Sequence, residues 1–362
     1  LPIFSFTLSI LGIRFFGKQN WGEFIFVLTI INFFAFLGNF GNKDFLLRKY
    51  SNNPSNIVTY FSSSFSSRIF LLLASLSLFF LVPNAIALLS ILLIFLIYTY
   101  QSFDSLIIYQ QKFLPQLIAE IIGFIIIVFW FLYDLNFELS NLLFAYIISY
   151  AFKMIYVSIS LKNEIRLFKF TFSIDELKKS FPFFLIIFSG WMASKIDVYI
   201  VNFKLSSEEI AEYQLGISAF LMLQSLSYLI ILPFNKHIYR LQTKSIKRIK
   251  IKLGFISIPI IVLGTFSIWI LLEKFASINL PPLFYFLGAF ASIPTFFFIV
   301  DILVYYKDKK ENKILIINLI STFINFIFTY FLISRFGIIG AITSVLITQY
   351  TILIFYKFNL IK

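Results

Sequence analysis

Residues 180–234 read SFPFFLIIFSGWMASKIDVYIVNFKLSSEEIAEYQLGISAFLMLQSLSYLIILPF, with two long apolar runs around a short polar stretch. A helix needs roughly 20 apolar residues, at 1.5 Å per residue, to cross ~30 Å of hydrocarbon. Both runs, residues 181–203 and 211–233, reach that length. Because hydrocarbon offers no hydrogen-bond partner to peptide groups, the stretch predicts two transmembrane helices joined by a tight turn.

The rest of the chain has the same character. Of its 362 residues, 60% are hydrophobic and 13% are charged, whereas an average soluble domain carries about 25% charged residues. We therefore predict an all-α polytopic membrane protein with about twelve transmembrane helices. The first span is short and lacks a starting methionine, so we expect a truncated N-terminus. The predicted spans are residues 1–17, 21–42, 65–82, 84–104, 115–133, 140–160, 181–203, 211–233, 252–272, 282–305, 313–333 and 337–357.

The net charge of +13 would suit nucleic acid, but the basic residues lie between the apolar runs. Anionic lipid headgroups and the retention of positive loops in the cytoplasm explain this distribution better. With the N-terminus inside, about 23 of the 30 Lys and Arg residues fall on the cytoplasmic side. We predict that both termini are cytoplasmic and that nucleic acid is not a partner.

The sequence also indicates an internal duplication. Residues 104–112, DSLIIYQQK, share the pattern D-x-L-x-x-Y-x-x-K with residues 301–309, DILVYYKDK, at the ends of the fourth and tenth predicted spans. Transporters are often built from two such repeats. The predicted domains are an N-terminal six-helix lobe at 1–160, a cytoplasmic interfacial linker at 161–180 and a C-terminal six-helix lobe at 181–362.

The linker contains Ser173-x-x-Glu176, a capping-box pattern followed by apolar residues. This pattern predicts a short interfacial helix that leads into the seventh span at Pro182 and serves as a hinge on the membrane surface. The alternative is a merely solvated linker.

Soluble catalytic chemistry has little support. There is no cysteine and a single histidine, His237, which lies in a basic loop where a solvated or headgroup role fits better than catalysis. Residues 12–19 nearly match a phosphate-binding loop, but Gln19 replaces the Ser or Thr that would bind magnesium. We expect no enzymatic activity, no catalytic residues, no metal site, no cofactor and no direct use of ATP.

Ionisable side chains inside spans are the candidate functional residues, because each costs about 2.5–3.5 kcal/mol to insert unless it faces protein or water. Lys195 and Asp197 lie two positions apart in the seventh span, so they point apart and each needs another partner or a watery cavity. For Lys195 the alternative is snorkelling with its stem against Trp191. Asp197 is too short to snorkel far, which favours a functional or gating role.

Four further in-span charges are candidates for contact with a substrate or cavity. Arg14 and Arg68 lie near helix ends, where anchoring at the membrane surface is the favoured explanation. Glu120 and Lys153 lie deeper and could pair with each other between neighbouring helices. Amides in the spans are explained more often by bonds between helices than by ligand binding; these are Gln224, Asn318, Asn325 and Gln349.

Several motifs are typical of one transporter family. Around the seventh and eighth spans they are Pro182 entering the helix, Asp197 before its end, Glu212-Tyr213 opening the next helix and Pro233 closing it. The front and the end of the chain add RFFG at 14–17, GEF at 22–24, LG at 37–38, Arg48 and RFGIIGA at 335–341.

These motifs resemble the O-antigen flippase (Wzx-type) branch of the superfamily that also contains multidrug and toxin extruders and peptidoglycan-precursor flippases. The resemblance implies two six-helix lobes around a central cavity in a bacterial cytoplasmic (inner) membrane. It further implies a flippase that moves undecaprenyl-pyrophosphate-linked oligosaccharide to the outer leaflet, coupled to an ion gradient. The expected partners are this substrate, membrane lipids and other polysaccharide-assembly membrane proteins.

The residues suggest a mechanism compatible with that resemblance. Lys195, Arg14 and Lys153 would attract the pyrophosphate, while Asp197 would carry a coupling proton or lock the outer gate. A drug or toxin extruder shares the implied fold and is the nearest alternative. A polysaccharide polymerase or ligase fits less well, because such enzymes generally display a long external loop with catalytic arginines.

Overall fold

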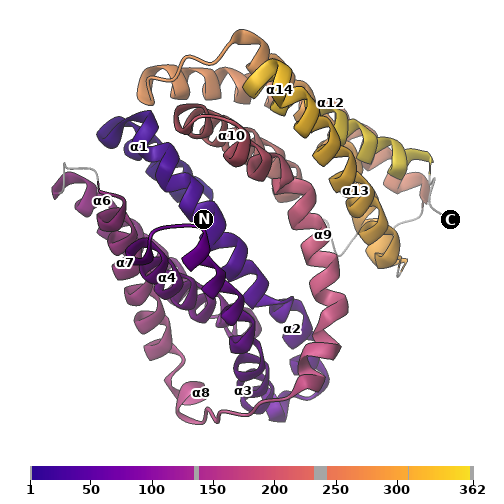
Figure 1. The fold of residues 1–362 in the computed structure, drawn as a ribbon. Coiled ribbons are helices and arrows are strands. Elements are labelled where there is room, and N and C mark those ends of the chain that lie inside the picture. The colour runs from indigo at the N-terminus through magenta and orange to yellow at the C-terminus, as the bar shows by residue number, and fades with distance from the viewer. Residues whose placement is uncertain (1, 134–137, 232–242, 309, 359–362) are drawn as a thin grey trace. The chain divides into compact units, whose positions relative to one another are not determined.

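The computed structural model describes residues 2–133, 138–231, 243–308 and 310–358. Every regular element in these ranges is a helix, and none of them contains a strand (Figure 1). The predictions for Pro233, His237 and Lys309 fall outside the described residues. In chain order the helices are α1 (Pro2–Asn39), α2 (Asn42–Asn52), η1 (Pro54–Asn56), α3 (Ile57–Arg68), η2 (Ile69–Phe80), α4 (Asn84–Ser102), α5 (Asp104–Gln110), α6 (Phe113–Tyr133), α7 (Leu139–Ser160), α8 (Lys162–Arg166), α9 (Ile174–Lys204), α10 (Ser207–Ile231), α12 (Thr243–Ile270), η4 (Leu271–Phe275), α13 (Pro282–Lys307) and α14 (Glu311–Phe358).

The described chain contains 10 helical segments long and apolar enough to cross a membrane, so the protein is a multi-pass membrane protein. Two of these segments include a glycine whose backbone is not helical. They are α1, with Gly17 at φ 80°, and α14, with Gly337 at φ 53°. Residues other than glycine rarely adopt positive φ, so a glycine at these two positions allows the helix to change direction.

Contacts on either side of each glycine show that the chain folds back there. Thr329 and Ser344 share a hydroxyl hydrogen bond, although residues 15 apart on a continuous helix would be separated by about 22 Å. In α1, a Cβ at Gly12 would lie 2.2 Å from the Trp21 ring. Both elements are therefore helical hairpins. Their arms coincide with predicted spans, but that each arm crosses the membrane stays a prediction.

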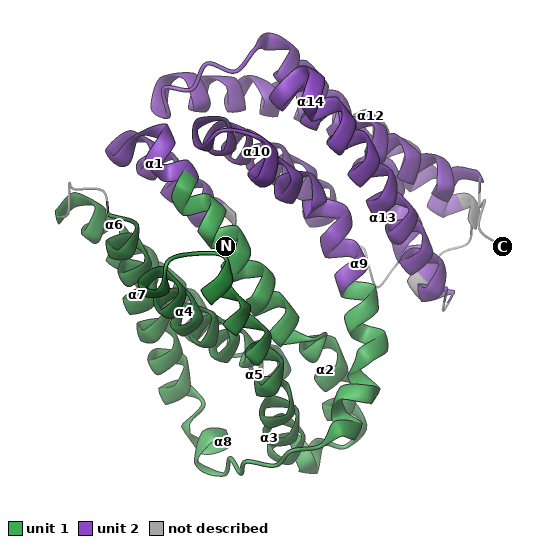
Figure 2. Cartoon of the chain, viewed as in Figure 1, with its two compact units in different colours: residues 1, 23–187 green, residues 2–22, 188–362 purple. Residues whose placement is uncertain are grey.

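The chain divides into two compact units (Figure 2). Unit 1 contains residues 23–187, and unit 2 contains residues 2–22 and 188–362. The boundaries fall inside α1 and α9 rather than in a loop. In unit 1, α7 packs against α4 and α6. The predicted domain division at 160 and 180 stays a prediction.

A buried cluster in unit 1 contains Phe45, Leu46, Tyr50, Phe61, Tyr100, Phe103, Leu106, Ile107, Ala119, Val157 and Leu161.

In unit 2, α10 and α13 pack with a glycine of each helix against a phenylalanine of the other. The Phe284 ring fills the space beside Gly216, and the Phe220 ring fills the space beside Gly288. Both pairs are spaced four residues apart along their helices, so the two contacts lie one turn from each other. Small residues allow close helix approach where lipid supplies no hydrophobic drive for association. The two rings are themselves in contact, with centroids 6.1 Å apart.

The predicted linker is attached to unit 1. Between α8 and α9 its peptide N–H groups at alternate residues donate to serine hydroxyls of α3. These bonds run from Lys169 to Ser62 (3.4 Å), from Thr171 to Ser66 (3.3 Å) and from Ser173 to Ser67 (2.8 Å). An extended segment presents alternate peptide groups to one side, which explains the spacing. The linker is therefore not a merely solvated connection.

The helix that follows the linker is longer than predicted. Instead of a separate interfacial helix, α9 continues from Ile174 through Pro182 to Lys204. The prediction of a short, distinct helix was wrong, because proline near the start of this long helix did not end it. The Glu176 carboxylate pairs with Lys49 of α2 at 2.6 Å. That pair joins the start of α9 to the rest of unit 1.

The reciprocal packing of glycine and phenylalanine between α10 and α13 can be tested by adding a methyl group at Gly288. A Cβ at Gly288 would lie 2.3 Å from the Phe220 ring, so Gly288→Ala must displace the ring. We expect a loss of about 1–3 kcal/mol in stability, measured as a lower thermal unfolding midpoint in detergent. At Gly190 the nearest atom would be 3.4 Å away, so Gly190→Ala is the matched control and should unfold at or above the wild-type midpoint. Equal midpoints for the two variants would contradict this packing.

Candidate functional site

Asp197 has its partner on a neighbouring helix, which is one of the two alternatives that the sequence left open. The carboxylate lies on α9, its side chain is 2% exposed, and it accepts a hydrogen bond from the Tyr213 hydroxyl of α10. Both residues belong to unit 2. A buried carboxylate without a partner would be costly. The bond to Tyr213 therefore makes the in-span charge tolerable and ties α9 to α10.

The next residue along α10 makes a second link. Glu212 accepts a hydrogen bond from Lys18 of α1, with 2.6 Å between Oε1 and Nζ. The backbones come close at the same place, since a Cβ at Gly22 would lie 1.7 Å from the Ser207 carbonyl oxygen. The adjacent side chains of Glu212 and Tyr213 thus connect α10 to both α1 and α9. We call this set (Lys18, Asp197, Glu212 and Tyr213) the unit 2 polar cluster.

Two predicted cations of unit 2 lie outside that cluster. Arg14 of α1 is exposed, and Lys195 of α9 is partly exposed. Neither side chain forms a salt bridge with a carboxylate in the described part of the chain. Lys18, in contrast, is paired with Glu212, and the charge of Asp197 still acts on Lys195 without a direct contact.

In unit 1 the structure joins two predicted residues directly. Lys153 of α7 and Glu120 of α6 form an ion pair at 2.8 Å between Nζ and Oε2. The Tyr100 hydroxyl of α4 donates to the other carboxylate oxygen at 2.8 Å. The ammonium of Lys153 also lies over the Tyr150 ring, 4.6 Å from its centroid. The pairing between neighbouring helices that the sequence left open is confirmed.

Arg68 is not a surface anchor, and that favoured interpretation was wrong. Its side chain is 1% exposed within unit 1. The guanidinium donates to the carbonyls of Gly38 (3.5 Å) and Asn39 (3.1 Å) at the end of α1, and to the Ser64 carbonyl (3.1 Å) of its own helix. The last carbonyls of a helix have no partner within it, and their end of the helix attracts cations. Arg68 therefore caps the C-terminal end of α1.

Aspartates in the duplicated motif are also held by other helices. Asp104 accepts a hydrogen bond from Gln116 of α6 at 3.0 Å. Asp301 of α13 forms an ion pair with Lys250 of α12. The sequence singled out these aspartates only as signs of duplication and gave Gln116 and Lys250 no role. Neither partner could be identified from the sequence, because the pairing depends on which helices are neighbours.

Hydroxyl and amide groups form a further buried cluster inside the α14 hairpin. The side-chain oxygen Oδ1 of Asn325 accepts hydrogen bonds from the hydroxyls of Thr329 (2.8 Å) and Ser344 (3.2 Å). Asn318, one of the predicted in-span amides, donates to Ser189 of α9 at 3.4 Å. Bonds between helix segments thus explain both amides, as the sequence favoured. Within the described ranges no group of three or more His, Cys, Asp or Glu residues could hold a metal ion.

Comparison by sequence identifies no family, since no protein-family model and no curated protein match the chain. Solved structures do match. The lipid II flippase MurJ in an inward closed conformation aligns with 99% of this chain and 85% of its own, with a TM-score of 0.77 and 16% identity. The chain has a MurJ/MATE-like fold. An inward-facing multidrug resistance MATE family transporter of the MOP superfamily aligns with 99% of this chain and 94% of its own, with a TM-score of 0.62 and 13% identity.

At such low identity the similarity establishes the MurJ/MATE-like fold and no activity. The roles predicted for Lys195, Asp197, Arg14, Lys153, Glu120 and Arg68 stay predictions. What the geometry adds is a separation between charges matched by protein groups and charges that are not. Tyr213 stood in the sequence only as part of the Glu212-Tyr213 motif, with no role assigned. Tyr100 was missed because the chain has 19 tyrosines, so a single tyrosine carried no signal.

The capping role of Arg68 predicts a loss of stability when the guanidinium is removed. Arg68→Met would leave the Gly38 and Asn39 carbonyls without their donor, at a cost of about 2 kcal/mol or more. We expect a lower unfolding midpoint in detergent. Arg14→Met changes an exposed arginine in the same way and should leave the midpoint near that of the wild type. A wild-type midpoint for Arg68→Met would remove the capping role.

The ion pair of unit 1 predicts non-additive substitutions. Lys153→Met alone leaves the Glu120 charge unmatched, and Glu120→Gln alone leaves the ammonium unmatched, so each should cost about 3–5 kcal/mol. The double variant removes both charges and should be less destabilised than the sum of the single variants. The check is a double-mutant cycle on thermal unfolding. Additive losses would mean that the two charges do not stabilise each other.

Proposed function

We propose that this protein is a flippase that moves undecaprenyl-pyrophosphate-linked oligosaccharide, a surface polysaccharide repeat unit such as O-antigen, from the cytoplasmic to the outer leaflet. The observation that carries the proposal is the structural similarity to a lipid II flippase over 99% of the chain. Sequence motifs that resemble the O-antigen flippases support the same choice. The proposed location is a bacterial cytoplasmic membrane, with both termini in the cytoplasm.

Binding of the substrate would rest on the cations that no protein carboxylate matches. A pyrophosphate is a strong hydrogen-bond acceptor, and charge-assisted bonds to it are stronger than neutral ones. Arg14 and Lys195 belong to the same unit, and neither forms a salt bridge with a described carboxylate. We assign the initial attraction of the pyrophosphate to these two residues. Lys153 is a weaker candidate, because Glu120 already neutralises it.

Coupling and movement have candidate parts in the same unit. Asp197 is held by Tyr213, so protonation of the carboxylate would weaken its charge-assisted bond and release α9 from α10. The unit boundary inside α9, near residue 187, is a better hinge than the linker at 161–180. The linker is bonded to α3 within unit 1, so it moves with that unit.

A multidrug or toxin extruder is the second candidate, supported by the similarity to the MATE transporter at a TM-score of 0.62. It would use the same fold with a different cargo. A polysaccharide polymerase or ligase is less well supported, since the solved structures similar to this chain are named as flippases and transporters.

The decisive experiment is deletion of the gene followed by location of the lipid-linked repeat units. We expect these units to accumulate on the cytoplasmic face, where a membrane-impermeant oxidant of sugars added to whole cells cannot reach them. Expression of the wild-type chain should restore their access. Normal access in the deletion strain, together with new sensitivity to cationic dyes, would reject the flippase and favour the extruder.

A substitution tests the assigned cation in the same assay. Lys195→Met should lower the rate at which repeat units reach the outer face by about tenfold, the loss expected for one charge-assisted bond. Lys204→Met is a matched control, because Lys204 ends the same helix and bonds instead to Ser334 at 3.2 Å. Equal rates for the two variants would exclude Lys195 from substrate binding.

A further inference from the structure

Two aromatic side chains of α9 flank Lys195, one a helical turn before it and one a turn after it. They are Trp191 and Tyr199, and all three residues belong to unit 2. Residues four apart on a helix lie on the same side, so these three side chains form one stripe along α9. Asp197 points to the other side, where Tyr213 binds it. The α9 stripe (Trp191, Lys195 and Tyr199) is therefore separate from the Asp197 bond.

All three side chains of the α9 stripe are partly exposed. They lie in a segment apolar enough to cross a membrane, Ile174–Lys204. Ionisable side chains in such segments face protein or water rather than hydrocarbon. Lys195 forms no salt bridge with a described carboxylate, and the charge of Asp197 acts on it without a direct contact. Water on this side of α9 accounts for the partly exposed ammonium.

The rings of Trp191 and Tyr199 approach each other from the turns before and after Lys195. Their centroids are 5.6 Å apart, and their planes are inclined by 58°. Rings at such an angle do not cover each other's faces, as parallel stacked rings would. The chain has 51 phenylalanines and 4 tryptophans, so its general abundance of phenylalanine does not explain a tryptophan at this position.

An aromatic pair around a cation suits a sugar that carries a phosphate. One side of a hexose ring presents C–H groups, which pack on the face of an indole or phenol ring while the hydroxyls stay in water. A cation beside the rings attracts the phosphate through charge-assisted bonds. One helical turn advances about 5.4 Å, which is the scale of the step from a hexose ring to the phosphate on its anomeric carbon. A cationic drug would instead meet the like charge of Lys195.

We infer that the α9 stripe binds the first sugar of a glycosyl pyrophosphate, with the sugar on the rings of Trp191 and Tyr199 and its phosphate at Lys195. The inference rests on the proposed function and deepens it, because it assigns recognition of the sugar to residues other than those that attract the pyrophosphate. Stacking depends on the shape of the sugar ring more than on the pattern of its hydroxyls. The stripe would therefore accept more than one kind of hexose.

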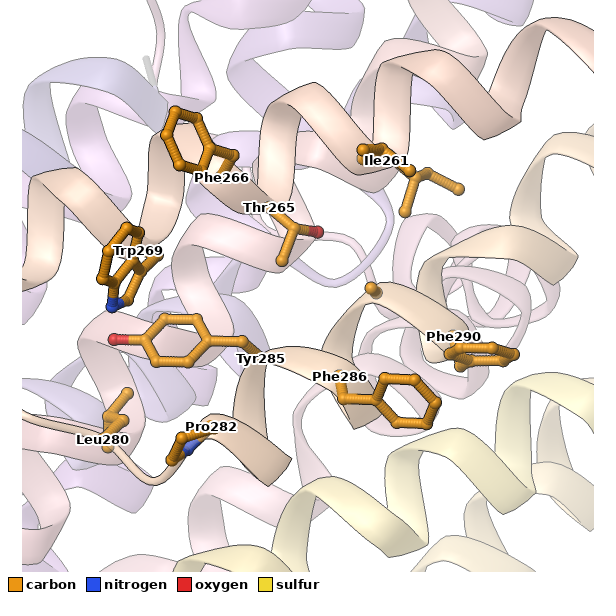
Figure 3. A pocket seen from close by; sticks show the side chains of 11 residues that line it. Ile261, Thr265, Phe266, Trp269, Leu280, Pro282, Tyr285, Phe286 and Phe290 are labelled. Atoms are coloured by element: carbon orange, nitrogen blue, oxygen red, sulfur yellow. The ribbon is translucent and has the colours of Figure 1, made fainter.

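A second tryptophan of unit 2 provides a matched comparison. Trp269 of α12 also lies beside another ring, with its centroid 5.8 Å from that of Phe266. Both residues line a groove of about 640 Å³ between α12 and α13 (Figure 3). No charged residue of the described chain lines this groove. Trp269 thus shares the paired rings of the α9 stripe but lacks the cation.

Binding of two probes to the purified protein in detergent tests the inference. One probe is a short-chain prenyl pyrophosphate, and the other is the same pyrophosphate carrying one sugar, in turn glucose, galactose and N-acetylglucosamine. Affinities are measured by isothermal titration calorimetry. We expect the wild type to bind the best of the glycosylated probes about tenfold more tightly than the bare probe, through contact of the sugar with two rings.

Substitutions separate the sugar from the phosphate. Trp191→Leu should lose the contribution of the sugar, so that the two probes bind alike, whereas Trp191→Phe keeps a ring and should retain most of the difference. Tyr199→Leu and Tyr199→Phe should differ in the same way. Lys195→Met should weaken both probes by a similar factor of about ten. Trp269→Leu is the matched control and should bind both probes as the wild type does.

Three outcomes would overturn the inference. Equal affinity of the wild type for glycosylated and bare probes would remove the sugar site and leave the flippase proposal standing. An equal loss for both probes in Trp191→Leu would mean that the ring is merely structural. Binding of a cationic dye with no binding of either probe would overturn the inference and the proposed function together. If Trp191→Leu does not fold, Tyr199→Leu against Tyr199→Phe decides by the same criterion.

Discussion

The structure depends on one constraint, which is that hydrocarbon offers peptide groups no hydrogen-bond partner. Helices satisfy their own peptide groups, and each place where a helix ends or turns must find other partners. The end of α1 shows one solution, because Arg68 of α3 donates to the carbonyls of Gly38 and Asn39. A charge that would be costly alone is thereby used to complete another helix.

The same constraint separates the charged residues into two groups. Lys153, Lys250 and Lys18 are each matched by a carboxylate on another helix. These pairs favour particular helices as neighbours, because a mismatch would leave a partly buried charge without a partner. Among the cations that the sequence singled out in unit 2, Arg14 and Lys195 form no salt bridge with a described carboxylate. Whether a cation is ion-paired therefore distinguishes structural charges from candidate functional charges better than its position along a predicted span does.

The sequence was informative wherever one helix decides the outcome. Apolar runs predicted the helical class and the approximate spans. The separation of Lys195 from Asp197 predicted that Asp197 needs a partner on another helix or a watery cavity. It was uninformative where two helices must meet. The bond from Tyr213 to Asp197 and the burial of Arg68 depend on packing that no local pattern encodes. The prediction of a short helix before Pro182 was wrong. It took a capping pattern and a proline as the two ends of a helix, whereas α9 continues through Pro182.

The three hydrogen bonds between the linker and α3 constrain the side chains of α3 more than those of the linker. On the linker side the donors are peptide N–H groups, which every residue except proline supplies. On the α3 side the acceptors are hydroxyls, which only a few side chains supply. Over evolutionary time the linker side chains at 169, 171 and 173 would be free to change, while Ser62, Ser66 and Ser67 would not. The linker stands out in the sequence because it is polar and charged. Its side chains would nevertheless be easier to replace than the three serines of α3.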